Sequence, residues 1–150
     1  MTTDPIHALD QASRAHAIAS IAHRGALDKI HVAYIEHPRA VAAPFDPVAQ
    51  WVEHAAAWLH DTVEDTAITA DGLLQAGIDP QVIEVVLLLS RSDDVSDADY
   101  YARIKAHPAA LAVKLSDIDH NTVPDRVAKL KPKKREELRV KYEKARAALA

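Results

Sequence analysis

The chain has 150 residues, 49% of them hydrophobic, and this length and composition suit one domain over residues 1–150 with a buried core. It contains no cysteine, which excludes disulfides, zinc–thiolate centres and cysteine nucleophiles and suits a reducing compartment. The formal net charge of −4 disfavours non-specific binding of nucleic acid, which requires a basic surface.

Helix start signals recur along the chain, and proline marks the first turn of most predicted helices. An Asp-Pro pair supplies an N-terminal cap and then a residue whose missing N–H costs nothing in the first turn. The scarcity of glycine also favours helices over strands. The predicted helices run from Asp4-Pro5 to near Gly25, from Asp46-Pro47 to Leu59, from Thr69 to Gly77, from Asp79-Pro80 to Leu89, from Ser96 through Ile104, from Pro108 through Leu115, and from Pro132 to the C-terminus.

The apolar segment 82–89 has a composition that suits a buried strand as well as a buried helix. Its Asp-Pro start and its helical surroundings favour the helix. We therefore predict an all-α fold, a single compact domain of about seven or more helices, with no strand. The longest irregular stretch is 25–37, and loops of that length in compact domains often carry function.

The most informative segment is 60–65, His-Asp-Thr-Val-Glu-Asp, which follows the apolar residues 55–59. Four acid or imidazole groups at the end of a buried helix would cost much free energy if left unpaired. A divalent cation is the simplest compensation. Adjacent helical positions point about 100° apart, so His60 and Asp61 can reach one ion only where the helix ends or distorts.

Two candidates elsewhere complete the predicted metal site. His37 ends the irregular stretch, and Asp117 lies four residues before Asn121 on one helix face. Each signal alone is weak, because a lone histidine is more often a surface residue and Asp117 could pair with Lys114. Nine histidines also make coincidences easy. Only the joint pattern indicates a metal-dependent hydrolase.

Together these segments resemble the HD-domain metal-dependent phosphohydrolases, and among them the hydrolase domain of RelA/SpoT-type enzymes and the small stand-alone alarmone hydrolases. The matching segments follow the family order and span roughly residues 15–130. They are Ala22-His23-Arg24-Gly25, Tyr34-Ile35-Glu36-His37-Pro38 with Ala40-Val41-Ala42, Leu59 to Thr66, and Val113 to Asp117 with Asn121.

The resemblance implies an HD-domain fold that holds one Mn²⁺ ion, although Fe²⁺ or Co²⁺ would suit the same mixed ligands. It implies an enzyme that removes the 3′-pyrophosphate of guanosine tetraphosphate (ppGpp), leaving GDP, without alarmone synthesis. Glu64 and Asp65 would orient and deprotonate the attacking water, and Asn121 would contact the substrate. The implied metal ligands are His37, His60, Asp61 and Asp117.

The loop after the first histidine departs from the family pattern. Asp28 stands where the resemblance implies an arginine that stacks on the base, whereas Lys29 remains a candidate phosphate contact. Asp28 could instead accept hydrogen bonds from the N1–H and N2–H₂ edge of guanine. Arg91 could clamp phosphate. His23 is either a substrate-site residue or a helix cap.

Three residues stay open between a role in the site and a structural role. Lys114 is read first as structural, and Arg126 as half of a surface ion pair. His120 could face the pocket or solvent. The structure has to decide between these alternatives.

Two other hypotheses stay open beside the guanosine alarmone hydrolase. One is an HD phosphohydrolase of another nucleotide, such as an adenosine alarmone or a nucleoside monophosphate, which Asp28 favours. The other is a non-catalytic nucleotide-binding module, which the complete set of acids and histidines disfavours.

The expected partner is a small nucleotide, with no nucleic acid and no membrane. The sequence opens with no signal segment and contains no apolar run near the ~18 residues of a membrane span, so we expect a cytoplasmic protein. An apolar stripe on the last predicted helix (Leu138, Tyr142, Ala145, Leu149) would pack on the domain or on a second copy in a homo-oligomer.

Overall fold

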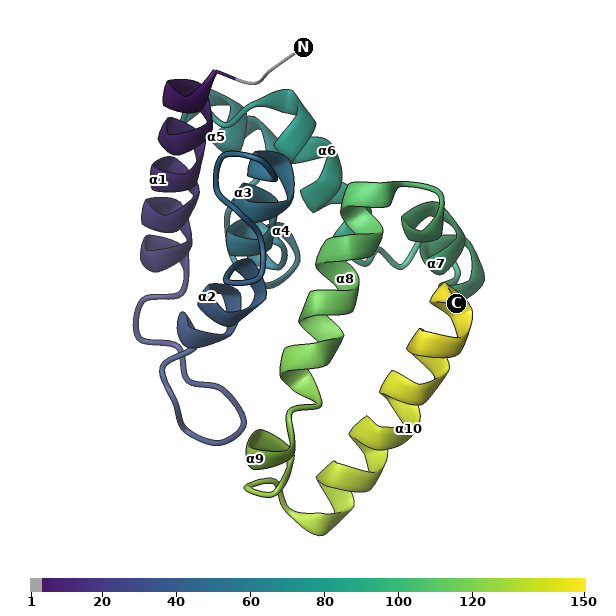
Figure 1. The fold of residues 1–150 in the computed structure, drawn as a ribbon. Coiled ribbons are helices and arrows are strands. Elements are labelled where there is room, and N and C mark those ends of the chain that lie inside the picture. The colour runs from purple at the N-terminus through teal and green to yellow at the C-terminus, as the bar shows by residue number, and fades with distance from the viewer. Residues whose placement is uncertain (1–3) are drawn as a thin grey trace.

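A computed structural model of the protein describes residues 4–150, and these residues form ten helices (Figure 1). The only strand-like feature among them is an isolated bridge between Leu27 and Ala33. The helices are α1 (Pro5–Ala22), α2 (Glu36–Ala42), α3 (Trp51–Leu59), α4 (Thr62–Asp65), α5 (Ala70–Gln75), α6 (Pro80–Leu89), α7 (Asp97–Lys105), α8 (Pro108–Asn121), α9 (Pro124–Val127) and α10 (Pro132–Leu149). The prediction of an all-α fold with seven or more helices is confirmed.

Most helices begin where the sequence signals placed them. Proline occupies the first turn of α1, α6, α8, α9 and α10. The Asp4 carboxylate accepts the N–H of Ile6, and the Asp79 carboxylate accepts the N–H of Gln81, as expected of N-terminal caps. The apolar segment 82–89 is helical, as its Asp-Pro start indicated.

The predicted start of the central helix at Asp46-Pro47 is wrong. The Asp46 carboxylate accepts the N–H groups of Val48 and Ala49, and this local capping holds residues 46–50 as a turn. Gln50, with φ −121° and ψ 47°, then departs from helical geometry, so α3 begins only at Trp51. Helix α2 was not predicted, and it converts the end of the expected irregular stretch into a helical turn that carries His37.

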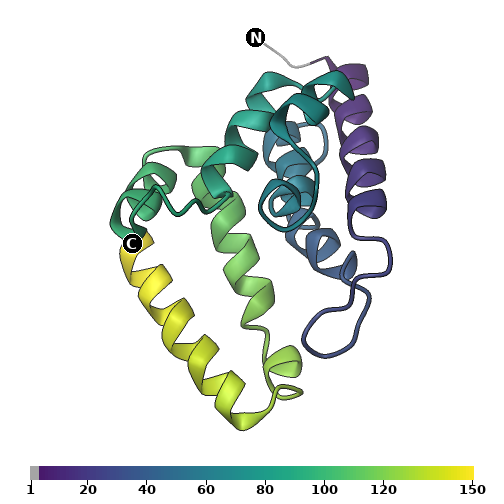
Figure 2. The same ribbon diagram turned by 180° about the vertical axis from the view of Figure 1, so that it is seen from behind.

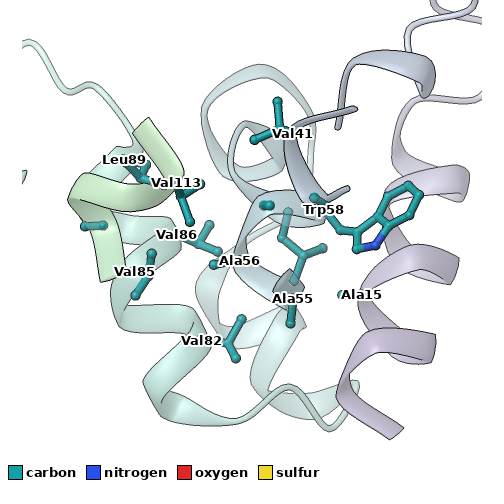
Figure 3. Packing of buried hydrophobic residues seen from close by; sticks show 14 of the residues in the cluster. Ala15, Val41, Ala55, Ala56, Trp58, Val82, Val85, Val86, Leu89 and Val113 are labelled. Atoms are coloured by element: carbon teal, nitrogen blue, oxygen red, sulfur yellow. The ribbon is translucent and has the colours of Figure 1, made fainter. Parts of the chain in front are cut away.

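The core is built around α3, which lies between α1 on one side and α6 and α8 on the other (Figure 3). Ala55, Ala56 and Ala57 are completely buried on it, and their small side chains let the neighbouring helices approach closely. Val82, Val85 and Val86 of α6 fill the space beside them. Because the backbone of α3 is enclosed on several sides, its C-terminal end has a fixed position within the molecule.

The last helix, α10, packs on α7 and α8 through its C-terminal half. Tyr142, Ala145 and Leu149 are buried there, so the predicted apolar stripe packs on the domain itself. The other half of α10 runs beside the end of α8 and the short helix α9 (Figure 2). Within residues 4–150, no helix has both the length and the hydropathy needed to cross a membrane.

Candidate metal centre

His60 and Asp61 lie at the junction where α3 ends and α4 begins. Helix α3 stops at Leu59 and α4 starts at Thr62, so the two residues are not consecutive positions of one regular helix. The Thr62 hydroxyl donates to the carbonyl of Leu59 at 2.9 Å and satisfies a group that the break leaves free. This break meets the condition under which neighbouring side chains can face one site.

The imidazole of His60 is oriented by the backbone of its own helix. Its Nδ1 lies 2.7 Å from the carbonyl oxygen of Ala57, which can only accept, so Nδ1 carries the hydrogen. In the neutral ring, Nε2 then has the free lone pair that a metal requires. This Nε2 lies 3.4 Å from Oδ1 of Asp117 and 3.7 Å from Oδ2 of Asp61.

Helices α2 and α8 bring two further groups to the same point. Nε2 of His37 lies 2.9 Å from Oδ1 of Asp117, and both side chains are buried. One potential ligand atom from each of His37, His60 and Asp117 lies within 4.8 Å of the other two. Three of the four predicted metal ligands therefore converge from α2, the end of α3 and α8.

The fourth predicted ligand, Asp61, adjoins this group but is not within the same mutual distance. Its carboxylate is held between the Nε2 of His23, at 3.1 Å from Oδ1, and the hydroxyl of Tyr34, which donates to Oδ2. Burial opposes ionisation, but His60, His23 and Tyr34 together keep the pKa of Asp61 below its ordinary value. Asp61 is therefore an anion that faces the three candidate metal ligands His37, His60 and Asp117, called the metal candidates below. Its own role as a ligand stays a prediction.

The buried carboxylates of the cluster are balanced by positive charge close to them. Burial lowers the pKa of His60, but the carboxylates of Asp61 and Asp117 raise it more, to about 9. The pKa of Asp117 lies well below its usual value: burial opposes this shift, and the hydrogen bonds from His37 and His60 outweigh it. Without an ion, the proton on His60 and the ammonium group of Lys114 thus balance the carboxylates of Asp61 and Asp117, and a metal ion could take the place of the proton. Two imidazoles with carboxylate oxygens fit Mn²⁺, Fe²⁺, Co²⁺ or Zn²⁺.

His120 contacts His37 from behind. The Nδ1 atoms of the two rings lie 2.7 Å apart, and the rings stack at 4.9 Å between centroids. Burial and the neighbouring His37 and Arg126 lower the pKa of His120 to about 4, so it is neutral and can accept the Nδ1–H of His37. Neutral His37 carries one ring hydrogen, so its Nδ1–H can donate to His120 once a metal binds Nε2 in place of the contact with Asp117. The structure thus places His120 toward the site rather than toward solvent.

Replacing His120 by alanine is expected to weaken metal binding about 10- to 100-fold, because His37 would lose the partner that fixes its tautomer and ring plane. Calorimetric titration of the metal-free protein with Mn²⁺ measures this directly. His120→Asn, whose carbonyl can also accept from His37, should recover part of the affinity. Equal affinities in the wild type and both variants would show that His120 is merely a packing residue.

The metal candidates open onto a cavity of about 530 Å³ between the loop 26–34, α8 and α10. Glu64 and Asp65 line it beside His60 and Asp61. The Glu64 carboxylate accepts the backbone N–H of Arg91 and is held in place by it. The Asp65 carboxylate has no hydrogen-bond or ion-pair partner within residues 4–150. Burial, with Glu64 and Asp61 nearby, raises its pKa, which makes this carboxylate a stronger base than an exposed aspartate.

The predicted substrate residues divide into two groups. Lys29, Arg91 and Asn121 line the cavity, and Asn121 also donates to Oδ1 of Asp117 at 3.0 Å. Arg91 contacts Asp97 and the hydroxyl of Tyr101, with its guanidinium 4.4 Å from the centroid of the Tyr100 ring. The other group comprises His23, which lies behind Asp61 and off the cavity wall, and Asp28, which lines the cavity but whose carboxylate is engaged within the protein.

Several cavity residues carried no clear signal in the sequence. Nζ of Lys114 lies 3.2 Å from Oδ2 of Asp117, and despite burial this contact raises the pKa of the lysine. The i, i+3 spacing from Asp117 was the one available signal for it. Lys141 and Tyr142 come from α10, whose position depends on tertiary packing alone. With Lys29, Arg91 and Arg126, the wall carries five cationic side chains in a protein whose net charge is negative.

No family model and no curated protein matches this sequence. Solved structures do match it. One, described as a metazoan ortholog of SpoT that hydrolyzes ppGpp, superposes with a TM-score of 0.70 over 93% of this chain and 85% of that chain, at 19% sequence identity. At this identity the likeness establishes the fold alone, and it agrees with the all-helical architecture that the sequence predicted.

Proposed function

We propose that the protein is a metal-dependent phosphohydrolase that removes the 3′-pyrophosphate of a guanosine alarmone such as ppGpp. The observation that carries the proposal is the meeting of His37, His60 and Asp117 at one end of a cavity whose walls also present five cations and four further acids, Asp28, Asp61, Glu64 and Asp65. The shared fold with a protein described as hydrolyzing ppGpp supports the same substrate class.

The metal would be held by His37, His60, Asp117 and the adjoining Asp61, and we propose Mn²⁺. When bound, such an ion lowers the pKa of a water molecule and polarises a phosphoryl oxygen. Tyr34 and His23 contribute by fixing the carboxylate of Asp61 from both sides. The ligand side chains are thus positioned before substrate arrives, which reduces the reorganisation that the reaction requires.

The two acids beside the metal candidates take different parts. The Asp65 carboxylate has no partner in the described part of the chain, and we assign to it the acceptance of the proton of the attacking water. Glu64 is fixed by the backbone of Arg91 and serves to orient that water. The two carboxylates therefore differ in their hydrogen bonding, although Glu64 follows His60, and Asp65 follows Asp61, by the same four positions in the sequence.

The cations of the wall supply charge for a substrate that carries several phosphates. Lys114 lies closest to the metal candidates, and Arg91 and Lys141 line the same cavity. Positioning and charge stabilisation are the main requirements of phosphoryl transfer, and these groups provide both. A neutral substrate would leave this concentration of positive charge without a role.

The test is a hydrolysis assay with a panel of nucleotides and added Mn²⁺. Release of pyrophosphate from ppGpp, with GDP as the other product, is the expected result. Hydrolysis of an adenosine alarmone or a nucleoside monophosphate instead would support a phosphohydrolase of another nucleotide. The presence of an aspartate rather than an arginine at position 28 favours this second candidate. If no nucleotide is hydrolysed and the protein as purified holds no metal, a non-catalytic binding module becomes the better account.

A further inference from the structure

Asp28 is an organising residue of the loop that forms one wall of the cavity. Its Oδ1 accepts the backbone N–H groups of Ile30 and Val32, each at 2.9 Å, and its Oδ2 lies 3.2 Å from Nη1 of Arg126. Only 5% of its side chain is exposed. With both oxygens engaged, this carboxylate is not available to accept the N1–H and N2–H₂ groups of a guanine base.

Arg126, the partner of Asp28, has donors to spare. Its ion pair with Asp28 is the only side-chain interaction of the guanidinium within residues 4–150, and it uses one end of a group with five N–H bonds. No buried side-chain nitrogen or oxygen in the described part of the chain lacks a partner, so the unused donors of Arg126 are accessible. Since Arg126 lines the cavity, these donors are available to a ligand there.

The guanidinium of Arg126 is held in place from two elements of the fold. Asp28 fixes it from the loop, and α9, which carries it, is fixed by Arg135 of α10. Arg135 donates to the carbonyls of Val127, Ala128 and Leu130 at 3.1 to 3.3 Å. The loop and α9 lie side by side in both views of the fold (Figures 1 and 2). Arg126 is therefore a pre-positioned donor.

The neighbours of Arg126 suit a planar ring. Leu27 and Ile30 of the loop and Leu130 after α9 line the cavity with it, so an apolar surface adjoins a row of N–H donors. Asn121 lies between this part of the chain and Asp117 in the sequence, at the end of α8. A nucleotide with its phosphates at the metal candidates can thus extend its base toward Arg126.

We infer that Arg126, held by Asp28, selects the base of the substrate by donating to the acceptor edge of a purine. An arginine fork matches O6 and N7 of guanine, whereas adenine presents an amino donor at that position. The inference rests on the proposed function, because it concerns the same cavity. Asp28, in the loop, then positions Arg126, and Arg126, on α9, selects the base.

Equilibrium binding separates this assignment from direct reading by Asp28. Titration calorimetry with GDP, IDP and ADP measures base preference without turnover. IDP keeps O6 and N7 but lacks the 2-amino group of guanine. If Arg126 reads the base, GDP and IDP should bind equally well and about tenfold more tightly than ADP. If a carboxylate reads the 2-amino edge, IDP should bind more weakly than GDP.

Variants then test the two residues. Arg126→Met should remove the tenfold preference for GDP and IDP, and Arg126→Lys, which keeps the charge but not the fork, should lose most of it. Asp28→Asn retains an acceptor for the loop but not the ion pair, and it should reduce the preference. Arg139→Met is the matched control, because it removes the same charge from an exposed ion pair on α10.

A preference for GDP and IDP that survives Arg126→Met would overturn the inference, as would equal binding of all three nucleotides by the wild-type protein. The outcome is distinct from that of the hydrolysis assay. A protein that selects guanine through Arg126 but hydrolyses no alarmone would contradict the proposed function and support the inference. A protein that hydrolyses ppGpp but binds GDP, IDP and ADP equally well would support the proposed function and contradict the inference.

Discussion

Replacing Asp117 by asparagine should lower the rate of ppGpp hydrolysis by about a thousandfold or more while the protein stays folded. Asp117 is the group that faces both His37 and His60, so its charge is central to holding a cation. Loss of the ion would remove several kcal/mol of transition-state stabilisation, and each 1.36 kcal/mol is a tenfold change in rate. The measurements are turnover with added Mn²⁺ and metal content after dialysis.

The control for this variant is Asp119→Asn, on the same helix but exposed and paired with Arg146 at 3.0 Å. It should keep both metal and activity. Asparagine preserves the shape of the aspartate side chain, so both variants should stay folded. Their thermal unfolding temperatures check this. An Asp117→Asn protein that binds Mn²⁺ as the wild type does would place the metal elsewhere.

Replacing Asp65 by asparagine should lower kcat by about 10²- to 10⁴-fold and leave metal binding unchanged. The amide cannot take a proton from water, whereas the metal candidates would be untouched. Because Asp65 has no partner within residues 4–150, the change should also leave stability nearly unaltered. Turnover at saturating ppGpp, with Mn²⁺ affinity measured in parallel, separates chemistry from metal loss.

The matched control is Asp71→Asn, the same chemical change at an exposed position in the first turn of α5. It should retain wild-type turnover. If Asp65→Asn keeps full activity while Glu64→Gln loses it, the roles of the two acids would have to be exchanged. If both variants remain fully active, neither carboxylate accepts the proton.

The helices were predictable where local chemistry decides them. The Asp-Pro starts of α1 and α6 need only a capping side chain and a proline, and both are visible in the sequence. The turn at residues 46–50 carried the same signal, but there the Asp46 carboxylate captured two N–H groups and delayed the helix. Capping and turn formation use the same residues, so the sequence alone does not separate them.

The metal candidates were predictable for a different reason. His60 and Asp61 are adjacent, and they directly follow the apolar segment 55–59, which indicates that they are buried, as the structure confirms. His37 and Asp117 were joined to them only through the resemblance, since no local rule brings residues 80 positions apart together. The structure now does so, with 2.9 Å between Nε2 of His37 and Oδ1 of Asp117.

The far wall of the cavity was not predictable. The sequence predicts Arg126 first as half of a surface ion pair and does not indicate its partner, which is Asp28, nearly a hundred positions away. Lys141 is one of many charged residues in the sequence of α10, and only the packing of α10 on α7 and α8 brings it to the cavity. Residues that reach a site only through tertiary packing are not marked by any periodic pattern in the sequence.

Anomalous diffraction from crystals grown with Mn²⁺ tests the central claim most directly. We expect one manganese peak per chain, within coordinating distance of Nε2 of His60, Nε2 of His37 and a carboxylate oxygen of Asp117. A fully occupied peak at any other position, or no peak between these three side chains at saturating Mn²⁺, would contradict it.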